Sequence, residues 1–327
     1  MFSNIRCEEL RSRMIEAADG SPQESILLSG GLDSSILASI IKPANAITIG
    51  LGPEAEDLPF AAGIAKRFCN RHIMVVINEQ NLLTIISKLV LLMRTFDPIE
   101  IRNSAVLYAG IEESVRRGYK GVITGDGCDE LFAGYNYMSR FDGRLHELEN
   151  ELNRIWEIMH FSSHTIGREL GVDISSPFLC SQFLEYAKVI NISEKIGYYD
   201  GKRWGKFILR KCFEKALGKE IAWRAKKAQE TGANITKISS VINEACSDKL
   251  YSIEKNKSKH DGVTIRDKEH LYYYLLFRRT FPPPRFFDKS FVFRCPNCLG
   301  PFIWKGSYCR TCGSHAIERF LDRKAPQ

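Results

Sequence analysis

The stretch Ser29-Gly30-Gly31-Leu32-Asp33-Ser34-Ser35 lies between the apolar runs 25–28 and 36–41, an order that predicts a strand, a phosphate-binding loop and a helix start. Two adjacent glycines let the backbone approach an anion, and the serines lie where a helix presents unpaired N–H groups and the positive end of its dipole. No Gly-Lys-Ser/Thr closes the stretch, so it is not a Walker loop. A carboxylate such as Asp33 beside bound phosphate is typical of a Mg²⁺ site. The alternative is a plain glycine-rich turn between a strand and a helix.

Strands and helices alternate along the first half of the chain. Strands are expected at 25–28, 46–50, 73–77 and 121–125, and helices at 58–68, 82–93 and 104–117. This alternation predicts an α/β fold with a doubly wound parallel sheet. Ligands bind beyond the carboxyl ends of such strands, so the segments 29–31 and 125–127 are expected to meet at one edge. Apolar residues at three- and four-residue steps from Leu145 to Met159 predict a helix whose apolar face joins the core.

The composition is that of a globular chain with a large core, because 44% of the 327 residues are hydrophobic. No apolar run is long enough to cross a bilayer, and acids occupy the first ten residues, where a signal peptide would be apolar. We therefore expect no membrane association and a cytoplasmic location. Reduced thiols are expected for six cysteines that are scattered singly, namely Cys7, Cys69, Cys128, Cys180, Cys212 and Cys246.

The net charge of +7 is unevenly distributed along the chain. Residues 1–190 carry 18 lysines and arginines against 25 acids, whereas residues 191–327 carry 28 against 14. The basic C-terminal half favours a polyanionic partner such as tRNA or another RNA. A solvated basic surface without any partner explains the same excess.

A second loop concentrates acids at the end of the expected strand 121–125. The sequence Thr124-Gly-Asp-Gly-Cys-Asp-Glu-Leu-Phe-Ala-Gly-Tyr135 places three carboxylates, those of Asp126, Asp129 and Glu130, within five positions. Such crowding is costly unless a cation shares it, which favours a metal site. The alternative is a capped helix start, where acids interact favourably with the dipole.

Five blocks of the sequence together resemble the synthetase domain of asparagine synthetases and relatives such as β-lactam synthetase, within the PP-loop ATP pyrophosphatases. The blocks are 29–35, 125–135, Pro177-Phe-Leu179, Lys206-Phe-Ile-Leu-Arg210 and Arg224-Ala-Lys-Lys-Ala-Gln229, in family order across residues 20–240. The first block is typical of any PP-loop enzyme, and the second is typical of the asparagine synthetase branch. The resemblance implies a PP-loop α/β sheet over 20–140 and a mainly helical part over 141–284.

The resemblance also implies roles for individual residues. Asp33 and Asp129 would ligate Mg²⁺. Asp126 stands where the family often has glutamate and would deprotonate the incoming nucleophile. Lys226 would neutralise charge as an acyl-adenylate forms and is attacked. The residues that would bind ATP are Leu28, Ser29, Gly30, Gly31, Asp33, Ser34, Ser35, Ile49 and Gly125.

The sequence departs from the family pattern around the third block. Where the family normally reads Gly-(Val/Leu)-Glu-x-Arg-x-Pro-Phe-Leu-Asp, this chain has Ser175 in place of the arginine and Cys180 in place of the aspartate. An Asp-Arg pair upstream is replaced by His164-Thr165. These changes remove fixed charges, and serine cannot grip a carboxylate as arginine does. Aspartate is therefore not implied as the substrate.

Glutamine-dependent members of the family begin with a glutaminase domain whose nucleophile is an N-terminal cysteine. This chain begins Met1-Phe2 and has its first cysteine at position 7, so we expect no glutaminase here. Nitrogen would come from free ammonia, an amine or a glutaminase partner.

Two Cys-x-x-Cys pairs, Cys295/Cys298 and Cys309/Cys312, follow the proline run 282–284. Paired knuckles of this kind form a tetrahedral S₄ site, which predicts a structural Zn²⁺ with no open position. Iron in a rubredoxin-like site and a redox dithiol are the alternatives. The expected domains are 1–284, the asparagine synthetase-like part, and 285–327, a zinc ribbon that needs its metal to fold.

The sequence thus predicts an ATP- and Mg²⁺-dependent amide-forming ligase. A small-molecule carboxylate is adenylated with release of pyrophosphate, and ammonia or an amine then displaces AMP. The alternative enzyme is a PP-loop tRNA-modifying enzyme that adenylates a nucleobase, which zinc ribbons and basic surfaces also fit. A non-catalytic ATP sensor is a third reading, against which Asp33, Asp129 and Lys226 argue. The acid, the nitrogen donor and a homo-oligomeric state are left open.

Overall fold

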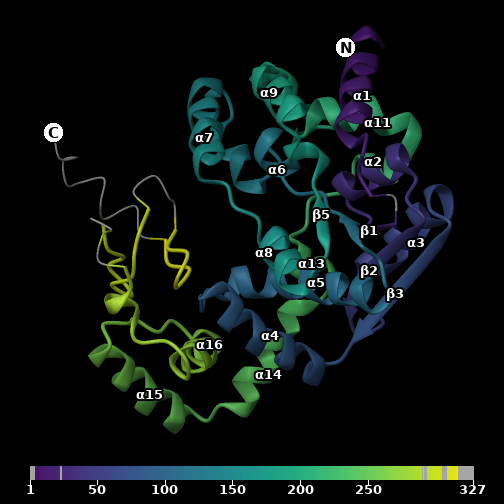
Figure 1. Ribbon diagram of the computed structural model, residues 1–327. Helices are drawn as coiled ribbons and strands as arrows, with labels where there is room; N and C mark the ends of the chain where they lie inside the picture. Colours follow the sequence, from purple (N-terminus) through teal and green to yellow (C-terminus); the bar gives the residue numbers. More distant parts are fainter. Residues whose placement is uncertain (1–3, 23, 289, 291–292, 304–307, 316–327) are drawn as a thin grey trace. The chain divides into compact units, whose positions relative to one another are not determined.

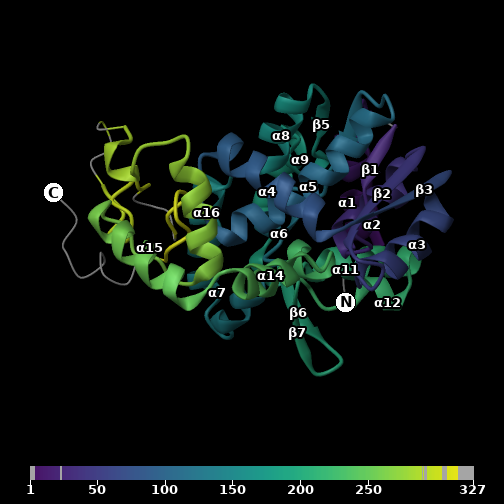
Figure 2. The ribbon, with the colours of Figure 1, turned by 90° about the horizontal axis from the view of Figure 1, so that it is seen from below.

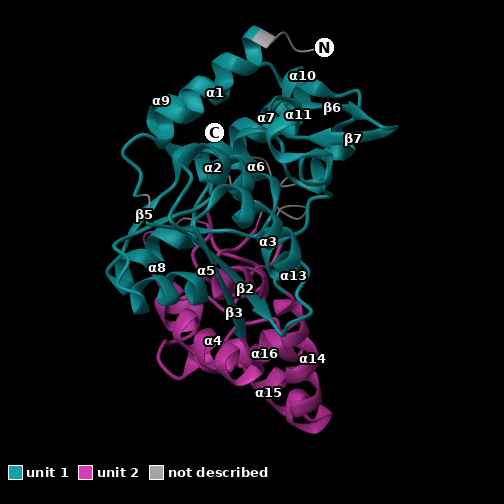
Figure 3. Ribbon diagram, turned by 90° about the vertical axis from the view of Figure 1, so that its right-hand side faces the viewer, with its two compact units in different colours: residues 1–76, 107–233 teal, residues 77–106, 234–327 magenta. Residues whose placement is uncertain are grey.

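The computed structural model describes residues 4–22, 24–288, 290, 293–303 and 308–315 of the chain. The chain forms two compact units, each built from two separate segments (Figure 3). Unit 1 comprises residues 1–76 and 107–233, and unit 2 comprises residues 77–106 and 234–327. Among the described residues, no helix combines the length and the apolar character that a membrane crossing requires. The boundary expected at residues 284 and 285 stays a prediction.

A five-stranded sheet forms the centre of unit 1 (Figure 1), with strand order β3-β2-β1-β4-β5. The strands are β1 (Ser25–Leu27), β2 (Asn45–Leu51), β3 (Arg71–Ile77), β4 (Gly121–Ile123) and β5 (Asp173–Ser175). β1 pairs in parallel with β2 and β4, and β4 pairs in parallel with β5. The predicted α/β class with a parallel sheet is confirmed. β5 escaped prediction because its three residues include only one apolar side chain.

Helices cover both faces of this sheet. On one face, Ile26 and Leu28 belong to a buried cluster with Leu32 and Ile36 of α2. On the other face, a Cβ added to Gly110 of α5 would lie 2.7 Å from the Leu27 side chain. Helices α1 (Asn4–Ala18), α2 (Leu32–Ile41), α3 (Asp57–Phe68), α5 (Pro98–Arg116), α6 (Cys128–Leu131), α7 (Leu145–Ile158), α8 (Ser162–Leu170), α9 (Ser181–Val189), α10 (Ile192–Lys195), α11 (Phe207–Leu217), α12 (Lys219–Ala222) and α13 (Gln229–Gly232) lie wholly or partly in unit 1.

The apolar stripe predicted between Leu145 and Met159 forms the inner face of α7, where Leu148, Leu152 and Ile155 are buried. An antiparallel hairpin of β6 (Ile196–Tyr199) and β7 (Lys202–Gly205) precedes α11 (Figure 2). Its last residue, Gly205, is followed by Lys206, the N-cap of α11.

The expectation of six reduced thiols is wrong for one pair. Cys7 of α1 and Cys212 of α11 form a disulfide across 205 residues of sequence. Their pairing follows from the packing of α1 on α11, which the spacing of the two cysteines does not reveal. The other four, Cys69, Cys128, Cys180 and Cys246, are free.

Unit 2 is a helical cluster followed by the cysteine-rich segment. Its helices are α4 (Glu79–Met93), α14 (Ile238–Ala245), α15 (Asp248–His260) and α16 (Lys268–Arg278). α16 packs against the other three. Phe96 lies fully buried at its side, with its ring centroid 5.0 to 5.2 Å from those of His270, Tyr274 and Phe277.

Lys195 is a buried amine whose replacement should stabilise unit 1. It is 1% exposed, its Nζ lies 4.8 Å from the Trp156 ring centroid, and burial lowers its pKa to about 8. A folded-state pKa below the ordinary ~10.5 means that folding disfavours the protonated amine, so at pH 7 the buried charge lowers the free energy of unfolding. This destabilisation disappears as the pH rises from about 8 to ~10.5, because the amine is then neutral in the folded state. The cation–π contact offsets part of the cost. We expect Lys195→Met to raise the free energy of unfolding by about 1–2 kcal/mol at neutral pH.

Urea unfolding at about pH 7 and again near ~10.5 measures this effect. The gain should shrink at the higher pH. Lys202→Met, at an exposed position of the hairpin, is the control and should change little. A loss of stability in Lys195→Met at neutral pH would contradict the expectation.

Candidate active site

The loop after β1 has no room for a side chain at residue 30. Gly30 has φ +68°, and a Cβ placed there would lie 2.5 Å from the backbone nitrogen of Ala61. Gly31 is the N-cap of α2, so Asp33, Ser34 and Ser35 fall in its first turn. The Ser35 hydroxyl is buried and has no hydrogen-bond partner in the described part of the chain. The loop therefore offers donors for an anion at a helix N-terminus.

The acidic loop after β4 lies directly beside this phosphate loop, as the sequence predicted. A Cβ on Gly125 would lie 3.1 Å from the Asp33 Cβ and 3.5 Å from the Ser34 nitrogen. The loop then enters α6, the short helix that carries Asp129. A side chain at Gly125 would thus lie in tight contact with Asp33.

Two lysines converge on the carboxylates of Asp33 and Asp129. Lys206 Nζ lies 2.6 and 2.7 Å from the two Asp33 carboxylate oxygens and 2.7 Å from Asp129 Oδ1. Lys226 Nζ lies 2.9 Å from Asp129 Oδ2. The Lys206 side chain is 3% exposed and that of Lys226 is 29% exposed. The structure therefore brings together the predicted Asp33, Asp129 and Lys226, and it adds Lys206.

The ion pairs dominate the electrostatics of this cluster. Burial by itself would raise the pKa of Asp129, but Lys206 and Lys226 outweigh it and hold that pKa well below the ordinary carboxylate range. Burial would lower the pKa of Lys206, and the two carboxylates outweigh that effect and raise it. Asp129 and Lys206 are therefore both charged at neutral pH.

Gly134 is required for this cluster to close. A Cβ there would lie 2.0 Å from Asp129 Oδ1 and 2.2 Å from Lys206 Cε, closer than any real contact. We expect Gly134→Ala to displace the Lys206 side chain and to lower the free energy of unfolding by about 2–4 kcal/mol, as overpacking and a broken buried ion pair would together. Chemical denaturation measures it. Gly63→Ala is the control, because a Cβ at that helical position meets nothing within 4 Å. Equal stability of the two variants would refute the expectation.

Two arginines hold the segment that leads to Lys226. Arg210 Nη1 donates to the carbonyl oxygen of Ala222 at 2.7 Å, and Arg210 is buried. The Arg224 guanidinium lies 2.9 Å from Asp57 Oδ1, and its central carbon lies 3.8 Å from the Phe60 ring centroid. The chain is thereby held at residues 222 and 224, and Lys226 lies two residues after Arg224.

Asp126 lies on the other side of the acidic loop, toward β5 and α8. Its Oδ2 accepts hydrogen bonds from Thr124 Oγ1 at 2.9 Å and from Ser163 Oγ at 2.5 Å. Burial raises the pKa of Asp126, and the two hydroxyl donors lower it in part. A carboxylate with a raised pKa is a suitable proton acceptor.

Glu130, the third acid of the loop, points elsewhere. Its carboxylate accepts a hydrogen bond from the Tyr135 hydroxyl, and burial followed by the nearby Asp129 raises its pKa to about 7. The three clustered acids thus occupy three different environments.

The remaining positions singled out from the sequence lie around these loops. Leu28, directly after β1, donates its backbone N–H to Ile47 and is buried, as is Ile49 in β2. Ser175 ends β5 with its hydroxyl 2.7 Å from that of Ser21. His164 is exposed at the start of α8.

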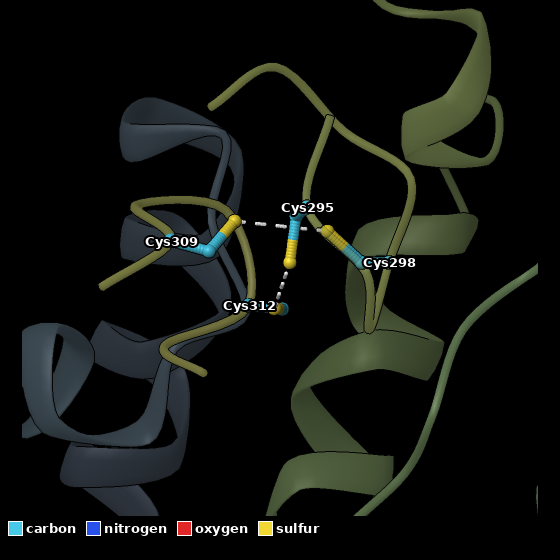
Figure 4. Close-up of side chains that lie close together, drawn as sticks. All are labelled: Cys295, Cys298, Cys309 and Cys312. Atoms are coloured by element: carbon cyan, nitrogen blue, oxygen red, sulfur yellow. Dashed lines mark hydrogen bonds between the residues drawn. The ribbon is translucent and has the colours of Figure 1, made fainter. Parts of the chain in front are cut away.

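The four cysteines of unit 2 form a buried cluster (Figure 4). All four sulfur atoms lie within 4.8 Å of one another. Cys295 Sγ lies 3.8 Å from Cys312 Sγ, and Cys298 Sγ lies 3.7 Å from Cys309 Sγ. A tetrahedron with ~2.3 Å metal–sulfur bonds has edges of about 3.8 Å, so these residues could hold one tetrahedral ion.

The second cysteine knuckle is anchored to the segment before α5. The Phe96 N–H donates to Thr311 O at 2.9 Å, and Thr95 Oγ1 donates to Arg310 O at 2.8 Å. Gly313, with φ +71°, has no room for a side chain, because a Cβ would lie 2.1 Å from Asp97 Oδ1. The knuckle is therefore an integral part of unit 2.

Comparison with known proteins agrees with the sequence blocks. The family model described as asparagine synthase matches residues 16–170 and 164–281, so the cysteine cluster lies beyond the matched range. Asparagine synthetase B [glutamine-hydrolyzing] of Escherichia coli (strain K12) is 28% identical over 283 residues, which cover 79% of this chain and 50% of that protein. The probable asparagine synthetase [glutamine-hydrolyzing] of Schizosaccharomyces pombe is 29% identical over 295 residues, covering 79% and 52%. The chain spans about half the length of the curated relatives it matches.

Proposed function

Because this chain belongs to the asparagine synthase family, we propose that it is an ATP-dependent, amide-forming ligase that adenylates a carboxylate and then lets ammonia or an amine displace AMP. The observation that carries the proposal is the convergence of Lys206 and Lys226 on Asp33 and Asp129, beside a loop built for an anion. Cations beside a phosphoryl centre stabilise the charge that develops as pyrophosphate departs.

The residues present fit ATP and Mg²⁺. The buried Ser35 hydroxyl without a partner would bind a phosphate oxygen together with the N–H groups of the loop. Asp33 and Asp129 would hold Mg²⁺, which would supply positive charge to the phosphates. Lys206 keeps the two carboxylates together, and Lys226 pairs with the second oxygen of Asp129. Asp126 would take a proton from the nucleophile.

The second substrate is an open part of the proposal. Ser175 and His164 stand where the family pattern has charged residues that would bind aspartate. We therefore propose a screen of several acids rather than aspartate alone. Ammonia, an amine or a glutaminase partner would supply nitrogen. A cytoplasmic location stays a prediction.

Exchange of labelled pyrophosphate into ATP tests the proposal, because it reports adenylation without the second step. The wild-type chain with Mg²⁺ is assayed with the proteinogenic amino acids, succinate and acetate, with and without bulk tRNA. Exchange with at least one acid is expected, with a loss of at least ~100-fold in Asp33→Asn and Lys226→Met. Lys227→Met, which alters the neighbouring surface pair with Glu56, serves as the control. Exchange that requires tRNA and no acid would overturn the ligase and favour tRNA modification, to which the basic C-terminal half points.

For the cysteine cluster we propose one structural Zn²⁺. Four thiolates leave no open coordination position, so the ion would hold the fold and take no part in the reaction. Optical absorption separates the alternatives, because an iron–thiolate site is coloured and a Zn²⁺ site is not. Metal analysis that finds no bound ion would favour the redox dithiol.

A further inference from the structure

A chain of hydrogen bonds leads from Asp126 to the exposed imidazole of His164. Thr124 Oγ1 donates to Asp126 Oδ2 at 2.9 Å and lies 2.9 Å from Ser176 Oγ. Ser176 Oγ in turn lies 3.2 Å from His164 Nε2. The chain joins the ends of β4 and β5 to the first turn of α8, and all of its members belong to unit 1.

The number of hydrogens fixes the direction of every bond in this chain. A hydroxyl carries one hydrogen, and that of Thr124 is used on Asp126, so the Thr124 oxygen must accept from Ser176. The single hydrogen of Ser176 is then used as well, so its oxygen must accept from His164 Nε2. While Asp126 is ionised, His164 therefore carries a hydrogen on Nε2.

Ser163, the residue before His164, contacts the Asp126 carboxylate directly. Its hydroxyl donates to the same oxygen, Oδ2, that Thr124 binds. Within the described residues, Asp126 Oδ1 has no hydrogen-bond donor. The arrangement holds the carboxylate by one oxygen and leaves the other open.

We propose that His164, Ser176 and Thr124 are positioning residues that orient the Asp126 carboxylate, so that its Oδ1 accepts the proton of the attacking amine. The inference rests on the proposed function. As the C–N bond forms, the bond from the acyl carbon to the AMP oxygen breaks and AMP leaves with the electron pair. The nitrogen gives one proton to Oδ1, and Oδ2 stays held by its two hydroxyl donors.

The first test needs no substrate. Nitrogen-15 NMR of histidine-labelled protein is recorded at about pH 8.5, roughly two units above the ordinary imidazole pKa. The His164 signals are assigned by their loss in His164→Gln. A hydrogen on Nε2 is expected in the wild type, and a clear shift of both ring nitrogens is expected in Thr124→Val, which keeps the shape and lacks the hydroxyl. A hydrogen on Nδ1, or identical spectra in the two proteins, overturns the proposal.

The second test separates the two half-reactions, with the acid that supports exchange and with hydroxylamine as the amine. His164→Leu and Thr124→Val should slow hydroxamate formation about 10- to 100-fold and leave pyrophosphate exchange within about twofold. His164→Gln and Thr124→Ser retain a donor at each point and should recover most of the rate. Arg168→Leu, one turn further along α8 and exposed, is the matched control.

A His164→Leu protein that forms hydroxamate at the wild-type rate overturns the positioning role. Parallel losses in exchange and hydroxamate formation also overturn it, because they indicate general damage to the fold. A wild-type chain that exchanges pyrophosphate with no acid overturns the proposed function instead. The NMR arm reports on the hydrogen-bond chain in either case.

Discussion

Replacement of Lys206 by methionine is expected to destabilise unit 1 by about 3–5 kcal/mol, because it leaves two partly buried carboxylates facing each other without their shared cation. The Asp33 and Asp129 side chains are only 19% and 14% exposed, so water cannot substitute for the ammonium group. Pyrophosphate exchange should fall by at least ~100-fold, since the two acids would no longer be held in position.

Thermal and chemical unfolding, with and without Mg²⁺, measure the loss. A divalent ion can bind two carboxylates, so Mg²⁺ without ATP should recover part of the stability in Lys206→Met. Without ATP it should add little to the wild type, where Lys206 already pairs with both acids. Lys215→Met lies on the same helix and is exposed, and it should behave like the wild type. A Lys206→Met protein with wild-type stability would show that the ion pairs do not hold the cluster.

Removal of the metal proposed for the four cysteines should have a comparable effect on unit 2. Cys309→Ser takes away one of four buried thiolates, and binding of structural zinc contributes on the order of 10 kcal/mol to the folding of small domains. We expect the free energy of unfolding of unit 2 to fall by at least about 4 kcal/mol. The fall should be smaller than in a small zinc domain, because the helices of unit 2 retain their own core. The buried N–H of Phe96 would also lose its anchor at Thr311.

Metal content by mass spectrometry and thermal unfolding check this together. The wild type should hold one ion per chain, and strong chelators should lower its melting temperature to that of Cys309→Ser. Cys246→Ser, a free cysteine of the same unit, should keep both the ion and the stability. A Cys309→Ser chain that retains a full equivalent of metal would refute the proposal.

The sequence predicted the parts of the structure that depend on local pattern. Alternating apolar runs placed four of the five strands, and their carboxyl ends placed Asp33 beside Gly125. The paired Cys-x-x-Cys spacing placed the four-sulfur cluster. In each case a short stretch determines its own conformation. For the strands, the parallel direction then places the loops after their carboxyl ends at the same edge of the sheet.

Long-range partners were beyond reach. Lys206 belongs to the block 206–210, but its ion-pair partners, Asp33 and Asp129, lie 173 and 77 residues earlier in the sequence. Nothing in the neighbouring sequence distinguishes such a buried lysine from a solvated one. The pairing of Cys7 with Cys212 has the same origin, because it depends on how distant segments pack. The hairpin of β6 and β7 is different: its two-residue turn, Asp200-Gly201, is a local signal that the prediction missed, and both residues have positive φ.

The distances in sequence between the members of the site have a kinetic consequence. Asp33 meets Lys206 across 173 residues, and Arg224 meets Ser29 across 195. In a chain that grows from its N-terminus, the two acids are therefore synthesised long before either lysine. Closing such long loops is slow, so the rate-limiting step of unit 1 should come late and should require the segment 206–226. A nascent chain released before that segment would hold a nearly complete sheet with a mutually repelling pair of acids at its edge.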